Sequence, residues 1–249
     1  MSRIGLQLYT VRDAAAADLT GALSRAAELG FEGVELHDLH GHAPDEVRAM
    51  LDAQGLVVCG RHVGLEAAED DLRGLAAELA TLGTDRLVVA WIQPPRTPAQ
   101  ADAAVARLVR AASRASEAGL QLGFHNHDAE VAAQADGRSV LDLLLAADDG
   151  PFLELDLGWA WYAGADPLML LATAGSRAPL VHVKDMRRDG GPVHVPLGRG
   201  DVDYRGLADA ANRAGVEWLI VEQDETDGEA FEAVADSLAR LRSLVEVPA

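Results

Sequence analysis

Short runs of consecutive apolar residues alternate along the chain with longer stretches in which apolar residues recur every three or four positions. Continuous apolar runs are typical of parallel strands that are buried on both faces. Eight such runs are expected as strands, at residues 4–9, 33–37, 56–63, 86–92, 120–125, 152–157, 180–184 and 217–222.

The stretches between these runs have the spacing of amphipathic helices. Leu19, Leu23 and Ala26 form one apolar stripe, and Gly30 follows as an expected helix stop. A glycine there ends many helices because it adopts the left-handed conformation easily. Similar stretches end at Gly83, Gly119 and Gly215.

Eight strands, each followed by a helix, in 249 residues predict a (β/α)8 or TIM barrel. With no linker or repeat in the chain, we expect one domain over residues 1–249. A doubly wound open sheet is the alternative, and it would place a glycine-rich phosphate-binding loop after the first strand. Residues 8–12 contain no glycine, which favours the barrel.

The chain carries 40 acidic and 21 basic side chains, for a formal net charge of −19. This charge repels phosphate backbones and anionic lipids, so we expect no nucleic-acid and no membrane partner. Cys59 is the sole cysteine, which excludes a disulfide framework and a thiolate metal cluster. The sequence has no run of 18 apolar residues and no signal-peptide core at its start, so a cytoplasmic location is expected.

Ionisable side chains gather where the expected strands end, which is where TIM barrels carry their active sites. Seven of the eight histidines, all but His194, lie in or just after these strand ends. Residues two apart share a face of a strand, as His125 does with His127, Glu154 with Asp156 and His182 with Lys184. Converging imidazoles and carboxylates suit a divalent ion such as Mn²⁺, Mg²⁺, Co²⁺ or Zn²⁺. The alternative is that these residues are solvated loop starts.

Five segments carry a resemblance to a known family. They are residues 4–10 (IGLQLYT), 30–35 (GFEGVE), 123–128 (GFHNHD), 182–185 (HVKD) and 196–203 (PLGRGDVD). With them the chain resembles the sugar phosphate isomerase/epimerase family of the xylose isomerase-like TIM barrel superfamily. That group includes ketose 3-epimerases, hydroxypyruvate isomerase, inosose dehydratase and endonuclease IV. The resemblance implies the barrel fold and metal-assisted carbohydrate chemistry.

The resemblance also implies one divalent metal ion, held by residues at the ends of the last four strands. The matching positions are His125, Asp156, His182 and Glu222. Relatives usually carry a glutamate in place of His125, where it also serves as an acid/base group, so an epimerisation by two glutamates is disfavoured. Trp159 stands where several relatives have a histidine, which argues against a multi-zinc endonuclease site.

Four residues are candidates for catalysis: Glu222, Lys184, His127 and Glu35. Lys184 is the sole lysine; it is expected to contact substrate, to transfer a proton through a pKa lowered by its pocket, or to pair with Glu222 or Asp156. His127 is a ligand, an orienting group or a substrate contact. Glu35 is a base or substrate contact, or else it forms a salt bridge inside the barrel mouth.

Five residues are candidates for substrate binding: Tyr9, His62, Trp91, Trp159 and Arg199. The aromatic side chains offer apolar faces on which sugars stack, with core packing as the alternative. The resemblance points His62 into the pocket. Arg199 lies in the long segment 186–203, expected as a loop on the active face, where it recognises an anionic group or is merely solvated.

These residues lead to three hypotheses about function. The first is a metal-dependent sugar or sugar-phosphate isomerase or epimerase that works through an enediolate. The second is a lyase, dehydratase or hydratase acting on a keto-sugar, keto-glycoside or inosose. The third is a non-catalytic barrel that binds a metabolite. The expected partner is a small carbohydrate, and a homodimer stays open.

Overall fold

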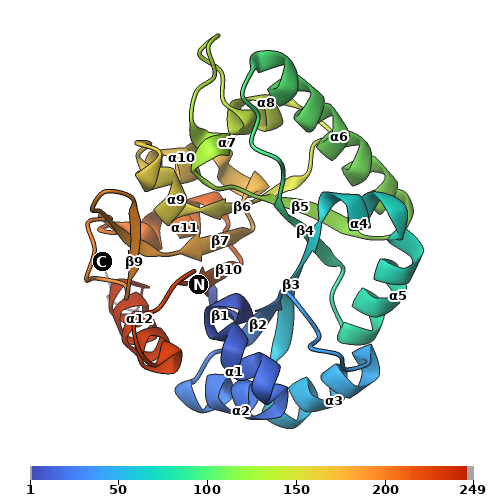
Figure 1. Ribbon diagram of the computed structural model, residues 1–249, viewed down its shortest axis with the longest axis vertical. Coiled ribbons are helices and arrows are strands. Elements are labelled where there is room, and N and C mark those ends of the chain that lie inside the picture. Colours follow the sequence, from blue (N-terminus) through green and yellow to red (C-terminus); the bar gives the residue numbers. More distant parts are fainter. Residues whose placement is uncertain (1, 246–249) are drawn as a thin grey trace.

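The eight apolar runs form eight parallel strands that close into one barrel, in the order β1-β10-β7-β6-β5-β4-β3-β2. This computed structural model describes residues 2–245 (Figure 1). The barrel strands are β1 (Arg3–Gln7), β2 (Gly33–Leu36), β3 (Val57–Gly64), β4 (Arg86–Trp91), β5 (Gln121–His125), β6 (Phe152–Asp156), β7 (Leu180–Val183) and β10 (Trp218–Val221). The predicted TIM barrel is thereby confirmed. The first expected strand, 4–9, ends early because Leu8 begins the short 3₁₀-helix η1 (Leu8–Val11).

Helices surround the barrel on the outside, as Figure 1 shows. They are α1 (Arg12–Ala17), α2 (Leu19–Leu29), α3 (Pro44–Gln54), α4 (Leu65–Asp70), α5 (Leu72–Leu82), α6 (Pro98–Glu117), α7 (Asp128–Val131), α8 (Val140–Ala146), α9 (Leu157–Tyr162), α10 (Pro167–Ala174), α11 (Leu207–Ala214) and α12 (Ala230–Val245), with the 3₁₀-helix η2 at Gly175–Arg177. The expected helix stop at Gly30 is confirmed, since its φ of +96° is left-handed.

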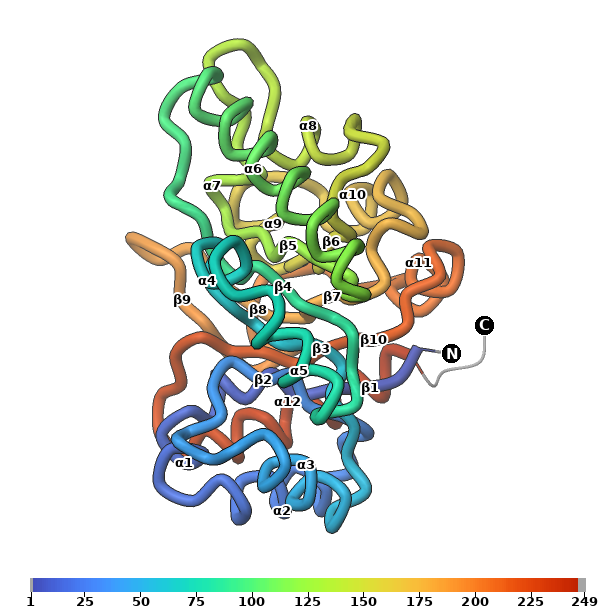
Figure 2. Tube along the Cα trace, turned by 90° about the vertical axis from the view of Figure 1, so that its right-hand side faces the viewer, coloured from blue at the N-terminus to red at the C-terminus, as the bar shows by residue number. Residues whose placement is uncertain are grey.

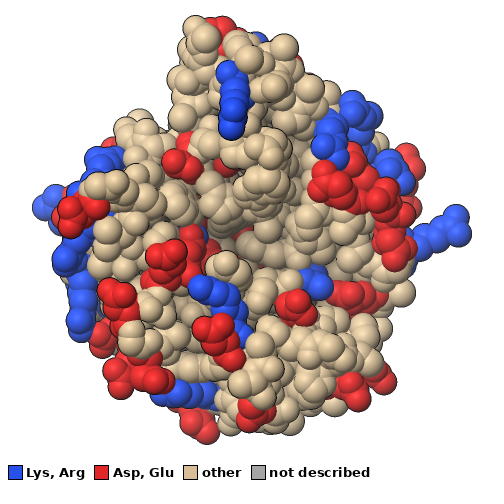
Figure 3. Space-filling view, viewed as in Figure 1, with Lys and Arg blue, Asp and Glu red and all other residues tan. Residues whose placement is uncertain are grey.

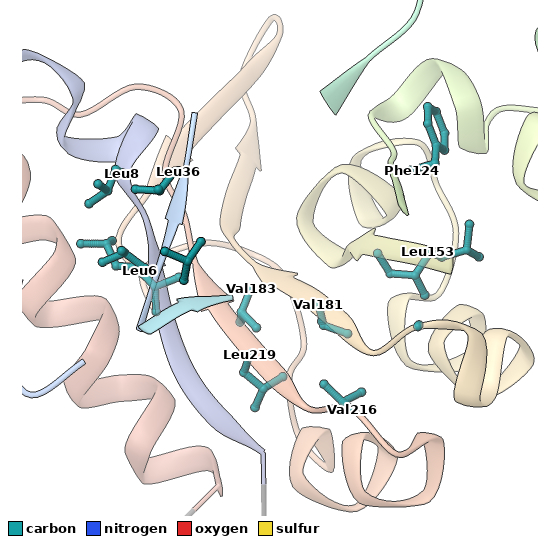
Figure 4. Close-up of a cluster of buried hydrophobic side chains, with 14 of the residues drawn as sticks. Leu6, Leu8, Leu36, Phe124, Leu153, Val181, Val183, Val216 and Leu219 are labelled. Carbon is teal, nitrogen blue, oxygen red and sulfur yellow. The ribbon is translucent and has the colours of Figure 1, made fainter. Parts of the chain in front are cut away.

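The main hydrophobic core lies between the barrel and its helices. Outward-facing strand residues such as Leu6, Val181 and Leu219 are buried there, and Figure 4 shows several of them together. Because side chains alternate along a strand, the residues between these positions point into the barrel. The same strands therefore carry an apolar outer face and a separate inner face.

The interior of the barrel is closed at its lower end by a second apolar cluster. Its buried members are Cys59, Val88, Leu180, Trp218 and Ile220. Two glycines make room for large rings: a Cβ at Gly33 would lie 2.7 Å from the Trp218 ring, and one at Gly123 would lie 2.3 Å from the Phe152 ring. This packing closes the barrel below the polar side chains of the site.

The segment 186–203, expected as a loop, instead contains most of a two-stranded hairpin, and that part of the prediction is wrong. β8 (Asp185–Arg188) pairs antiparallel with β9 (Pro192–Val195). Figure 2 shows β9 on the side opposite the start of β1, and this side is the mouth of the barrel. Among residues 2–245, no helix has the length and apolar character needed to cross a membrane.

Candidate active site

Inward-facing residues change from apolar to ionisable as the strands approach the mouth. On β7 and just beyond it, Leu180 is followed by His182 and then by Lys184, each two residues further along. On β6, Glu154 lies beside Leu180 and Asp156 beside His182, and both carboxylates are fully buried. Period-two alternation thus stacks two layers of ionisable groups above the apolar floor.

The upper layer brings together the four residues that the resemblance implied as metal ligands. His125, Asp156, His182 and Glu222 each offer one donor atom, and these atoms all lie within 4.8 Å of one another. Asp156 Oδ2 is fully buried and lies 2.8 Å from Lys184 Nζ. Two imidazoles and two carboxylates are a donor set that Zn²⁺, Mn²⁺ or Co²⁺ accepts, so the residues present fit a divalent ion.

Burial and neighbouring charges set the protonation of this layer. Burial, with help from the nearby His182 and His127, lowers the pKa of His125 well below its usual value, which leaves its imidazole neutral. Burial raises the pKa of Asp156 to about 6, although Lys184 opposes it. Burial would lower the pKa of His182, but the surrounding glutamates outweigh it and raise that pKa.

Lys184 lies at the centre of three carboxylates. Its Nζ is 2.6 Å from Asp224 Oδ1 and 2.8 Å from both Asp156 Oδ2 and Glu222 Oε2. Burial alone would lower its pKa, but the three anions outweigh burial and raise it well above the ordinary value. The expectation of a lowered lysine pKa is therefore wrong, and Lys184 is a cation. The ion pairs with Asp156 and Glu222 that the sequence left open are present.

The lower layer is a closed hydrogen-bonded network of Glu35, His62 and Glu154. His62 Nε2 lies 2.6 Å from Glu154 Oε2 and 3.1 Å from Glu35 Oε2. These two carboxylates outweigh burial and raise the pKa of His62 to about 10. Burial is also the largest influence on Glu35, yet the cationic His62 and His182 lower its pKa overall. For Glu154, burial and the nearby Glu35 raise the pKa.

A pocket of about 450 Å³ opens above these layers at the mouth. One wall carries His127, Lys184, Glu222 and Asp224, and the rest includes His37, His62 and an apolar stretch with Val63, Ala90 and Trp91. Figure 3 looks onto this face, and its surface is hollowed near the centre. Such a mixture of apolar wall and converging polar groups is typical of small-molecule sites.

Of the predicted substrate-binding residues, three line the pocket, namely Tyr9, His62 and Trp91. Trp159 lies behind it, where the indole Nε1 donates a hydrogen bond to Asp224 Oδ2 at 3.1 Å. Arg199 does not line the pocket; its guanidinium is exposed and pairs with Asp236 on α12. The contact that the sequence predicted for Arg199 is therefore not formed in this structure.

Of the predicted catalytic residues, Glu222, Lys184 and His127 line the pocket, whereas Glu35 does not. Glu35 is fully buried beneath His182, whose Nε2 lies 2.7 Å from Glu35 Oε2. Its side chain thus takes the salt-bridge alternative. Burial lowers the pKa of His127 to about 4, so this pocket imidazole is neutral at neutral pH.

Three residues of the site escaped the prediction. Glu154 shares a strand face with Asp156, and Asp224 follows Glu222 by two residues, so period-two spacing pointed to both. His194 reaches the site from the hairpin: its ring packs on Trp159 with 5.3 Å between centroids. The Gly190-Gly191 pair at the hairpin turn was the signal for that placement.

The segment after Lys184 is held rigidly around one carboxylate. Asp185 accepts hydrogen bonds from the backbone N–H groups of Gly198, Gly200 and Val202 at 2.7, 3.0 and 3.1 Å. The Tyr204 hydroxyl then donates to the carbonyl oxygen of Lys184 at 2.6 Å. The PLGRGDVD segment is therefore a scaffold that fixes the backbone beneath the lysine.

The curated proteins with similar sequences include inosose dehydratases. The chain is 29% identical over 210 residues to an inosose dehydratase of Geobacillus kaustophilus, a match covering 74% of this chain and 66% of that protein. An inosose dehydratase of Lacticaseibacillus casei is 26% identical over 57% of this chain and 53% of its own length. The matches thus span less than two thirds of these two relatives.

Solved structures share the fold. A sugar phosphate isomerase/epimerase from Parabacteroides distasonis superposes with a TM-score of 0.84 at 19% identity, covering 100% of this chain and 99% of that one. The family model described as xylose isomerase-like TIM barrel matches residues 23–244. The chain therefore belongs to the xylose isomerase-like TIM barrel family.

Proposed function

We propose that this protein is a divalent-metal-dependent dehydratase that removes water from a keto-polyol such as an inosose. The observation that carries the proposal is the pairing of a neutral imidazole with a cationic lysine beside four metal donors. His127 has a pKa of about 4, whereas that of Lys184 is raised, and both line one pocket. The neutral imidazole of His127 has a free lone pair that can accept a proton, and the cationic amine of Lys184 has a proton to donate.

A bound divalent ion would supply Lewis acidity, which polarises the carbonyl of the substrate and acidifies the adjacent C–H bond. His127 accepts the carbon-bound proton through its neutral imidazole. Lys184 donates a proton to the departing hydroxyl as the β C–O bond breaks, so that water leaves. His127 then releases its proton to solvent and Lys184 takes one up, so the net reaction is loss of one water molecule and needs no oxidant or second substrate.

The remaining candidate base is less suited to this step. Glu222 lies 2.7 Å from His182 Nδ1 and 2.8 Å from Lys184 Nζ, and these two cations lower its pKa despite burial. Its Oε2 is thus already engaged by both cations. Glu222 is better suited to holding the metal and the lysine.

Exposed aromatic side chains support a carbohydrate as the substrate. Trp91 is 54% exposed and Tyr9 is 40% exposed, although both are large, and both line the pocket. Rings held at a pocket wall are suited to stacking on the apolar face of a sugar or cyclitol. The net charge of −19 adds support for a small neutral substrate over nucleic acid.

Isomerisation or epimerisation of a keto-sugar is the second candidate, because it begins with the same proton abstraction. It requires that the proton return to carbon, whereas elimination requires an acid beside the departing hydroxyl, a role that the cationic Lys184 in the pocket wall fits. The curated relatives named inosose dehydratase also support elimination.

The test is to incubate Zn²⁺- or Mn²⁺-loaded protein with an inosose in deuterated water. We expect an unsaturated ketone or its dione tautomer, detected by ultraviolet absorbance and mass spectrometry, and loss of this product in His127→Asn. Glu117→Gln, an exposed change on α6, is the matched control and should keep full activity. Deuterium exchange without an unsaturated product would favour isomerisation instead.

A further inference from the structure

Both histidines of the candidate metal site have one ring nitrogen facing the upper layer and the other facing the lower layer. For His125, Nε2 lies 3.7 Å from Asp156 Oδ2 and Nδ1 lies 3.0 Å from Glu154 Oε2. For His182, Nδ1 lies 2.7 Å from Glu222 and Nε2 lies 2.7 Å from Glu35. A neutral imidazole has one N–H and one lone pair, so the partner of one nitrogen decides what the other offers.

The direction of these hydrogen bonds can be followed from a backbone group. The Tyr9 N–H donates to Gln7 Oε1 at 3.0 Å, which turns the amide nitrogen of Gln7 toward Glu35. That nitrogen donates to Glu35 Oε2 at 2.7 Å, so this oxygen is an acceptor. His182 Nε2 faces the same oxygen and must donate to it. When His182 gives up one proton to a metal ion, its lone pair therefore belongs to Nδ1, which faces the upper layer.

The second histidine is fixed through His62. Its Nε2 lies between Glu154 Oε2 and Glu35 Oε2 and donates toward these carboxylates. His125 Nε2 faces the upper layer, so a metal ion there would take the lone pair of Nε2 and leave the N–H at Nδ1, which lies 3.0 Å from Glu154 Oε2. Gly60 provides the space for this network, since a Cβ there would lie 2.3 Å from Glu35 Oε1.

We propose that Glu35 and Glu154 are positioning residues that fix the tautomers of His182 and His125, so that both histidines present lone pairs to one metal ion. Carboxylates that accept the second N–H of a ligand histidine orient the ring and raise its basicity. The role of Glu35 is therefore to hold a ligand from beneath and not to exchange protons with substrate.

The lower layer contains a competing possibility that this proposal excludes. His62, His125, Glu154 and His182 also offer donor atoms within 4.8 Å of one another. Metal binding there would use His125 and His182 through the nitrogens that now donate to glutamates. Neutral imidazoles cannot serve both layers, and the upper group offers two carboxylates, Asp156 and Glu222, where the lower one offers only Glu154. The proposal thus predicts one metal ion per chain.

The direct test is nuclear magnetic resonance of Zn²⁺-loaded protein labelled with ¹⁵N in its eight histidines. Two-bond ¹H–¹⁵N spectra distinguish the two tautomers, and the His125→Asn and His182→Asn variants assign the signals. We expect His125 protonated at Nδ1 and His182 protonated at Nε2. Either histidine in the opposite tautomer would overturn the proposal.

The second test measures Zn²⁺ affinity by competition with a chelator. Glu154→Gln is expected to weaken binding by about 10- to 100-fold, as other losses of such partners do. Gln7→Met, which removes one donor to Glu35, should weaken it by about two- to tenfold and guards against misfolding of the first variant. Glu117→Gln should bind as the wild type does. Unchanged affinity in both interior variants, or two zinc ions per wild-type chain, would overturn the proposal.

This inference rests on the metal dependence of the proposed function, yet the two fail in different ways. A zinc-binding protein with the expected tautomers but without dehydration would contradict the proposed function alone. An active dehydratase whose histidines have the opposite tautomers would contradict this inference alone.

Discussion

Two levels of the barrel interior use inward-facing positions of the same strands, yet they differ completely in chemistry. The lower level holds Leu180, Trp218 and Ile220 and is closed to water by packing. Two or four residues further along, the upper level holds His182, Lys184 and Glu222. In the lower level, burial of apolar area stabilises the fold. In the upper level, desolvation of charged groups destabilises it unless these groups pair with one another.

Residues on the same strand can meet two different physical requirements at its two ends. The apolar floor requires only that its side chains fit together, so Gly33 on β2 leaves space for the Trp218 ring and Gly123 on β5 leaves space for the Phe152 ring. The charged layers need partners as well, since an ion buried without one is very costly. Lys184 has three carboxylates within 2.8 Å, and His62 has two within 3.1 Å. The site is thus polar at the mouth only because the floor beneath it is dry and fixed.

The largest expected effect comes from removing a donor of the upper level. Asp156→Asn keeps the shape of the side chain but takes away one anionic ligand and one partner of Lys184. We expect loss of high-affinity metal binding and a fall in kcat/KM of at least about a thousandfold, since metal-assisted polarisation is worth several kcal/mol. Steady-state kinetics and metal analysis measure it. Activity within tenfold of the wild type would contradict a chemical role for this level.

The next effect is on the floor. Trp218→Ala leaves a cavity beneath the charged layers and is expected to lower the free energy of unfolding by about 3–5 kcal/mol. Because Trp218 contacts no metal donor, zinc bound per folded chain should stay at the wild-type value. Urea denaturation and zinc titration below the midpoint test both parts. A floor variant of normal stability that binds no zinc would erase the distinction between the two levels.

A third prediction concerns protons. In the metal-free protein, Asp156 has a pKa of about 6 and the pKa of His182 is raised, so a metal ion must displace protons from them. Below pH 6 both groups carry a proton, and above it only His182 does. The logarithm of metal affinity should rise by about two per pH unit below pH 6 and by about one above it. Calorimetry in buffers of different ionisation enthalpy counts the protons, and a count independent of pH would contradict the assignment.

The smallest effect is expected at the rim. Trp91→Ala removes an exposed ring from the pocket wall but touches neither interior level. Loss of stacking should raise KM by about two- to tenfold with kcat nearly unchanged. An equal fall in kcat would show that this ring acts on the chemical step instead.

Much of the fold and of the site was predictable from periodicity. The eight apolar runs identify the strands, and spacing by two residues places His125 with His127 and Asp156 with Glu154. The combined effect of charges from different strands on a single pKa was not predictable. A lowered pKa was one of three alternatives for Lys184, and the carboxylates that raise its pKa instead come from β6 and from the segment after β10.

The sequence also did not predict how deep a side chain lies in the barrel or where a long connection places its residues. Glu35 looked like a pocket residue because it ends a strand, yet the bulge beside it and Gly60 hold its carboxylate below the mouth. Arg199 was expected at the pocket, but the loop built around Asp185 turns it toward Asp236. His194 was set aside for lying far from a barrel strand, and the hairpin returned it to the site.

We expect the upper level to hold a single divalent ion, and the charged layer of Glu35, His62 and Glu154 beneath it to hold none. The most direct measurement is an anomalous difference map from crystals of the zinc-loaded protein. The account predicts one peak per chain among His125, Asp156, His182 and Glu222. A peak bounded by His62 and Glu154, or no peak at saturating zinc, would contradict it.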